Sequence, residues 1–151
     1  MMWWVLSILA LWLLFNWVSP FAALLSTQAK PISRGRLPAE LLRWGKDKEV
    51  RFYVADLKRG YGFSVWAPPW SVVVFDKRFF TNAYPNMIRY VVAHELAHFS
   101  LGHHRERWLM VITGLVILPS VRKRLHEMEA EADAEAERVT GFKRSFFPQL
   151  Q

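Results

Sequence analysis

The sequence predicts an α+β protein in which an N-terminal transmembrane helix precedes a small domain. Three observations carry this prediction. A long apolar run without charge opens the chain, three short strand-like runs follow it, and two helical patterns, one rich in histidine and one in glutamate, come last. The chain has 151 residues, about the size of one domain. It contains no cysteine, which excludes disulfides and thiolate-bound metal.

The opening apolar run is long enough to predict a membrane anchor. Trp3 to Leu25 is 23 residues, which as a helix spans roughly 35 Å, against about 30 Å for a bilayer core. Asn16, Ser19 and Pro20 are its weak points. A cleaved signal peptide is the alternative. No Lys or Arg precedes the run, however, and it is longer than a usual signal core, so we expect an uncleaved anchor.

The charges around this helix predict its orientation and partners. Lys30, Arg34 and Arg36 follow the apolar run and nothing basic precedes it, so the positive-inside rule places the rest of the chain in the cytoplasm. We therefore expect a single-pass membrane protein anchored by residues 1–29. The net charge of +7 suits an anionic lipid surface. No basic-aromatic recognition module is present, so nucleic acid is not an expected partner, and nothing sets the oligomeric state.

After the anchor we expect a linker with one short helix, residues 30–48, and then a domain, residues 49–151. Within that domain three runs rich in β-branched and aromatic residues predict strands of a short antiparallel sheet. These runs are VRFYVAD (50–56), YGFSVW (61–66) and SVVVFD (71–76), separated by Gly60 and by Pro68-Pro69. After Pro85 the apolar spacing becomes helical and continues to a stop at Gly102.

This predicted helix carries the motif H-E-x-x-H as "HELAH". His94 and His98 are four residues apart and share one face, so both imidazoles can reach one metal ion, for which Zn²⁺ is the expected cofactor. Glu95 points to the side. There it can take a proton from metal-bound water and pass it to a leaving amine. The alternative is a half-buried helix with two incidental histidines.

Two further histidines, His103 and His104, follow the motif. On a continuing helix neither one reaches the metal without a sharp chain reversal, because His103 lies half a turn from His94 and His104 about 120° from His98. A metzincin-type third ligand at His104 would need glycine where Leu101 stands. We therefore expect both to be exposed histidines near a helix C-terminus, where positive charge is tolerated.

An acidic helix is predicted near the C-terminus, since residues 127–137 hold six acids and no base among helix-forming alanines. A solvated acidic face is common in such helices. Composition alone therefore does not single out a metal ligand. The acids fall on two faces of the helix, one with Glu129, Asp133 and Glu137 and the other with Glu127, Glu131 and Glu135.

The segment "VVAHELAHFSLGH" followed by "EAEADAEAERVTGF" resembles the membrane-associated gluzincins, which include HtpX-type and CAAX prenyl proteases. The resemblance covers roughly residues 50–142 and implies a zincin-like domain with zinc metallopeptidase activity on a polypeptide substrate. Because the predicted anchor confines the site to the membrane, membrane-associated substrates are expected. It places the glutamate ligand of the family on Glu129, beside His94 and His98. It places the aspartate that orients a ligand histidine on Asp133, and the general base and acid on Glu95.

Other features of the resemblance stay open. Tyr90 and His126 are both conceivable as the side chain that stabilises the transition state, because each lies one turn before a predicted ligand. The alternative function is a non-catalytic metal-binding membrane adaptor or regulator, against which the intact Glu95 argues. The substrate is expected along an edge strand of the sheet.

A second apolar run, Trp108 to Val121, separates the two motifs. If His98 and Glu129 bind one ion, they lie on the same side of a membrane, so this run cannot cross it once. Its 14 residues would span about 21 Å as a helix, too short for a comfortable crossing. The run is therefore expected either in the core or as a helix lying on the membrane surface.

Overall fold

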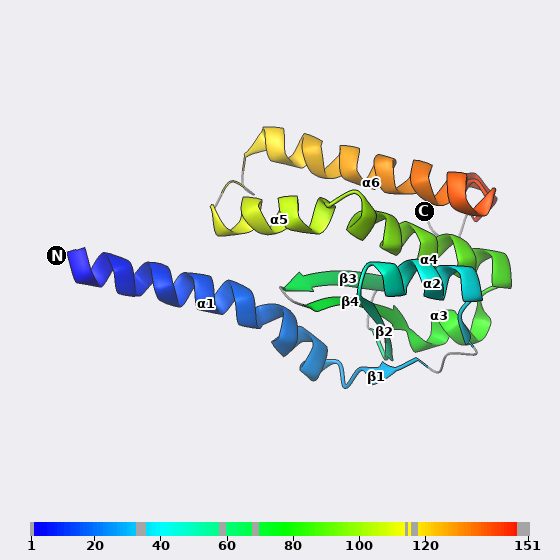
Figure 1. Ribbon diagram of the computed structural model, residues 1–151, viewed down its shortest axis with the longest axis horizontal. Coiled ribbons are helices and arrows are strands. Elements are labelled where there is room, and N and C mark those ends of the chain that lie inside the picture. Colours follow the sequence, from blue (N-terminus) through cyan, green and yellow to red (C-terminus); the bar gives the residue numbers. More distant parts are fainter. Residues whose placement is uncertain are drawn as a thin grey trace.

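The computed structural model describes residues 2–32, 36–57, 60–67, 70–113, 115 and 118–147. It has an α+β architecture in which three long helices lie beside a small sheet (Figure 1). The elements are α1 (Met2–Ser26), β1 (Lys30–Pro31), α2 (Ala39–Asp47), β2 (Val50–Ala55), β3 (Gly62–Ala67), β4 (Trp70–Asp76), α3 (Lys77–Asn82), α4 (Pro85–Ser100), α5 (His103–Ile112), α6 (Pro119–Thr140) and a 3₁₀ turn (Arg144–Phe146).

The sheet is mixed, which corrects the prediction of an antiparallel sheet. Its strand order is β1-β2-β4-β3, with β2 and β4 parallel and the other two pairs antiparallel. The run Val73–Phe75 in β4 is fully buried, as expected for a strand covered on both faces. This run therefore takes a central place between β2 and β3, and β3 becomes an edge strand. The two-residue β1 lies inside the predicted linker and is too short for a sequence pattern.

Helix α4 forms the centre of the domain, because its apolar face is buried against the sheet, α2 and α6. Helix α6 runs antiparallel beside α4 and α5 (Figure 1). Ala132 and Ala136 on α6 are fully buried, and their small side chains permit close packing against α4. This packing brings the acidic segment of α6 next to the H-E-x-x-H motif.

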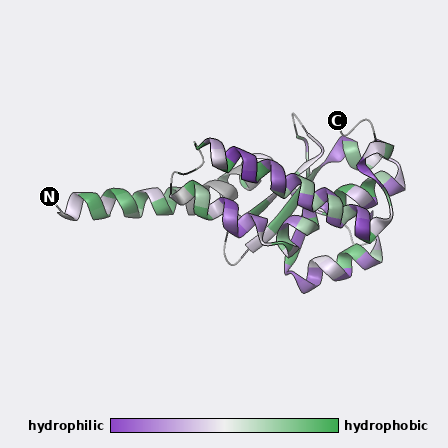
Figure 2. Cartoon of the chain, turned by 90° about the horizontal axis from the view of Figure 1, so that it is seen from above, coloured by the Kyte–Doolittle hydropathy of each residue, from purple (hydrophilic) through white to green (hydrophobic). Residues whose placement is uncertain are grey.

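The structure does not support the predicted N-terminal transmembrane helix. The prediction of a single-pass membrane protein is therefore wrong. Among the residues that the structure describes, no helix combines the length and the apolarity needed for a membrane crossing. The predicted helix does form as α1, mostly apolar and extending away from the domain (Figure 2). Asn16, Ser19 and Pro20 interrupt its apolar sequence.

The predicted orientation and the cytoplasmic placement of the domain both depended on a membrane-spanning α1. Neither prediction is supported. One of the basic residues used to predict the orientation, Arg34, lies outside the described residues. The expected contact with a lipid bilayer stays a prediction from the sequence. Around α1, the structure itself records contacts with β3 and α5.

The second apolar run is not one helix. It holds the end of α5, a turn, and the first residues of α6, so the chain reverses within it. Trp108 packs edge-on against Trp66 of β3, with ring centroids 6.0 Å apart. The described large apolar side chains beyond Trp108 lie mostly at the surface, which does not favour the core alternative; these are Leu109, Val111, Leu115 and Leu118.

Candidate metal centre and cleft

The structure brings the three predicted ligands together. His94 and His98 lie one turn apart on α4, and their Nε2 atoms are 3.2 Å from each other. Glu129 on α6 places Oε2 at 3.4 Å from Nε2 of His94 and 3.7 Å from Nε2 of His98. These three residues form a group able to hold a metal ion.

The size of this triangle fits zinc. A circle through the three atoms has a radius of about 2.0 Å, calculated from their separations. Zn–N bonds are about 2.0–2.1 Å and Zn–O bonds about 2.0–2.2 Å, so one ion close to the plane can reach all three atoms. Two imidazoles and one carboxylate are also a donor set of catalytic zinc, which leaves a fourth position open.

Glu129 is held as a carboxylate. Its contacts with His94 and His98 keep the pKa of this carboxyl far below its ordinary value, despite partial burial. Its second oxygen, Oε1, lies 3.5 Å from Nη2 of Arg107 on α5. The residue is thus charged and oriented from two sides, as a ligand must be.

Asp133 contacts the ring of His94 on the side away from the ligand triangle. Its Oδ1 lies 2.8 Å from Nδ1 of His94, an ion-pair contact. Oδ1 also accepts a hydrogen bond of 2.9 Å from the hydroxyl of Tyr90, and Oδ2 one from Arg144. Burial lowers the pKa of His94, but Asp133 and Glu129 outweigh it and raise the value to about 9.

The prediction that His103 and His104 are exposed is wrong. Gly102 adopts a left-handed conformation, with φ +75°, which separates α4 from α5, so that a new helix begins at His103. Both histidines are consequently buried, His103 completely. Sequence reasoning assumed a continuing helix, although Gly102 was the signal that could have revealed the turn.

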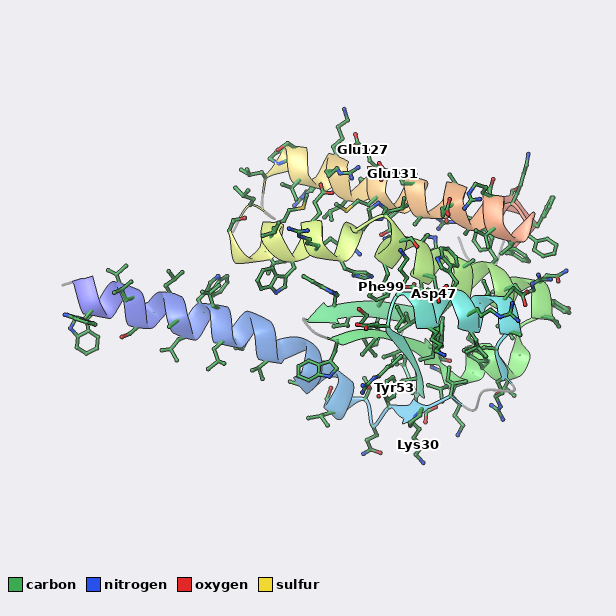
Figure 3. The ribbon with its side chains drawn as sticks, viewed as in Figure 1. Lys30, Asp47, Tyr53, Phe99, Glu127 and Glu131 are labelled. Carbon is green, nitrogen blue, oxygen red and sulfur yellow. The ribbon has the colours of Figure 1, made fainter. Side chains whose placement is uncertain are left out.

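His103 lies behind His98 and joins it to α6. Its Nδ1 is 3.0 Å from Nδ1 of His98, and its Nε2 is 2.8 Å from Oε2 of Glu131. Arg124 donates to the other oxygen of Glu131 at 2.7 Å and forms two hydrogen bonds with Glu106 on α5. Figure 3 shows Glu131 on α6, one turn from Glu127. The sequence placed Glu131 only on an acidic face.

His104 is buried in a different environment. Its ring lies 4.2 Å from that of Phe99, measured between centroids. Its Nε2 is buried and has no hydrogen-bond partner among the described residues. Burial, and next the charge of nearby His98, lower the pKa of His104 to about 3, so this side chain is neutral at ordinary pH.

A cleft of about 260 Å³ opens beside the ligand triangle. Glu95 lies in its wall, next to His94, and another wall is formed by Gly60 and Tyr61 together with Gly62, the first residue of edge strand β3. Of the two conceivable transition-state residues, Tyr90 lines the cleft, whereas His126 is exposed and is not among the lining residues. The lining consists of Gly60, Tyr61, Gly62, Tyr90, Val91, His94, Glu95, Glu129, Asp133 and Arg144.

Comparison with known families and curated proteins identifies no relative of this chain. A scan against profiles of known families finds none that matches the chain, and a search of curated proteins finds no match. The resemblance to gluzincins therefore depends on the two motifs and on the geometry that joins them.

Proposed function

We propose that this protein is a zinc-dependent metallopeptidase of the gluzincin type, in which His94, His98 and Glu129 hold the metal. The observation that carries the proposal is the ligand triangle, whose dimensions suit zinc and two of whose members, His94 and Glu129, line a cleft together with Glu95. In this proposal Asp133 fixes the ring of His94, as outer partners of ligand histidines do.

Zinc bound at this site would lower the pKa of water and polarise a peptide carbonyl. The carboxylate of Glu95 takes a proton from the attacking water and returns it to the leaving amine, so that one carboxylate serves as base and then as acid. Glu95 is suited to this task because it lies in the cleft wall next to His94 without being one of the three ligands.

The substrate in this proposal is a polypeptide that binds in extended form along β3. That strand is the edge of the sheet, and its first residue, Gly62, lies in the cleft wall. An edge strand offers unpaired backbone N–H and C=O groups, to which an extended peptide can add as a further strand. Gly62 itself keeps β3 close to β4, since a Cβ there would come within 2.8 Å of the carbonyl oxygen of Val74.

The first test separates catalysis from metal binding. We expect Glu95→Gln to lower the rate at which the purified full chain cleaves a protein substrate such as casein by at least about 100-fold, because the amide cannot accept the proton. Zinc content, measured by atomic absorption, should stay at the wild-type level. If wild type binds zinc but cleaves nothing, or if cleavage survives the substitution, the protease proposal fails and the non-catalytic metal-binding alternative is favoured.

The second part of the test concerns the third ligand. Glu129→Ala should lower zinc affinity by more than the roughly 10- to 100-fold expected when an outer hydrogen-bonding partner of a ligand is removed. Glu135→Ala is the matched control, since it removes from the same helix a carboxylate that pairs with Arg138 and belongs to neither the ligand triangle nor the residues lining the cleft. Equal zinc affinity in the two variants would remove Glu129 from the ligand set.

A further inference from the structure

The second ligand histidine has its own line of support, which runs from His98 through His103 to Glu131. Successive polar atoms along it are 3.0 Å and 2.8 Å apart. His103 is completely buried, and both of its ring nitrogens have polar partners. It therefore does more than fill space in the core. A buried imidazole with two well-placed partners has a defined tautomer.

The chemistry of Glu131 decides which tautomer this is. An ionised carboxylate only accepts hydrogen bonds, so the proton of a neutral His103 ring must lie on Nε2, facing Glu131. Nδ1 of His103 then carries a lone pair and accepts from Nδ1–H of His98. With its proton on Nδ1, His98 presents a lone pair at Nε2, the atom that points at His94 and Glu129.

We propose that His103 and Glu131 are positioning residues that hold His98 in the Nδ1–H tautomer and so prepare its Nε2 to bind zinc. The inference rests on the proposed function and deepens it. The opposite tautomer would place a proton on Nε2 of His98, where the metal belongs, and would direct a lone pair of His103 at the carboxylate.

The carboxylate at the end of this line is itself held in place. Arg124 donates a hydrogen bond to Oε1 of Glu131 and one to each carboxylate oxygen of Glu106, at 2.8 and 3.0 Å. Arg124 and Glu131 belong to α6, whereas Glu106 and His103 belong to α5. The arrangement therefore ties the two helices together and fixes the oxygen that receives the proton of His103.

The test measures zinc affinity by competition with a chromogenic chelator, using the full chain. Glu131→Leu removes the acceptor and should weaken zinc binding about 10- to 100-fold. Glu131→Gln should restore much of the loss, because its amide oxygen can still accept from His103. Glu135→Leu, on the same helix and paired with Arg138 instead of Arg124, is the control and should bind zinc like wild type.

A purely structural role would give a different pattern. If Glu131→Leu weakens zinc binding no more than Glu135→Leu does, or if Glu131→Gln restores nothing, the inference is overturned. If wild type binds no zinc at all, the proposed function itself fails, which is a separate result.

A second measurement applies if Glu131→Leu does not fold. Nitrogen-15 NMR of histidine-labelled, metal-free wild type reports which nitrogen of His98 carries the proton. We expect Nδ1–H, and a dominant Nε2–H form would overturn the inference.

Discussion

The two ligand histidines of α4 are both supported by α6, but in different ways. Asp133 contacts His94 directly and also lies in the wall of the cleft, where it binds Tyr90 and Arg144. Glu131 reaches His98 only through the buried ring of His103. In the proposed enzyme the first support is therefore shared between metal and substrate regions, whereas the second serves the metal alone.

Among the changes that test this difference, the largest expected effect comes from Asp133→Asn. We expect zinc affinity to fall about 10- to 100-fold, because the charge that orients the ring of His94 is lost. We also expect KM for the peptide substrate to change when zinc is saturating, because Tyr90 and Arg144 lose their shared partner in the cleft. Chelator competition and steady-state kinetics measure the two effects.

Glu131→Leu sharpens this difference. It should lower zinc affinity without changing KM at saturating zinc, because Glu131 is not among the residues that line the cleft. Tyr90→Phe controls for the loss of one hydrogen bond to Asp133. Equal changes in KM for Asp133→Asn and Glu131→Leu would contradict the division between the two supports.

The sequence predicted the Asp133 side of the site and missed the Glu131 side, for a physical reason. His94, His98, Glu129 and Asp133 lie within two regular helices, so a repeat of 3.6 residues is enough to place each on a face. His103 depends on a left-handed residue, Gly102, that changes the direction of the chain. Its position cannot be obtained by continuing the helical repeat.

The same distinction holds for the fold. The strands β2, β3 and β4, and the helices α2, α4 and α6, were predicted from local patterns, and the structure confirms them. Strand order is a tertiary property, and the parallel pairing of β2 with β4 was not predicted. The transmembrane assignment of α1 was wrong although its helical conformation was right. The apolar composition of α1 predicted its helical conformation correctly, but not whether the helix crosses a membrane.

A smaller effect is expected from His104, the buried histidine without a carboxylate partner. Its pKa of about 3 in the folded chain lies below the value of about 6.5 for an unfolded histidine. The unfolded chain therefore binds the proton first, and stability falls as the pH drops below about 6.5, until the folded pKa is reached. At pH 5 the loss is about 2 kcal/mol. His94, whose pKa is raised, has the opposite sign and loses its contribution only as the pH rises towards 9.

Chemical denaturation of the metal-free chain between pH 5 and 8 measures this loss. His104→Phe should reduce the acid sensitivity, because the ring still packs against Phe99 and no proton can bind. An unchanged pH dependence in His104→Phe would contradict the assigned pKa.

The smallest expected effect separates the two left-handed glycines. Gly102 and Gly141 have almost the same φ, +75° and +74°, and a Cβ on either would meet no atom within 4 Å. Alanine at either position should therefore cost about 1 kcal/mol of unfolding free energy through backbone strain alone. Zinc affinity should distinguish them. Gly102→Ala disturbs the turn that delivers His103 to His98, whereas Gly141 ends α6 beyond the ligand and should leave zinc binding unchanged. Equal zinc affinities in two equally destabilised variants would mean that the turn at Gly102 serves folding and not the metal site.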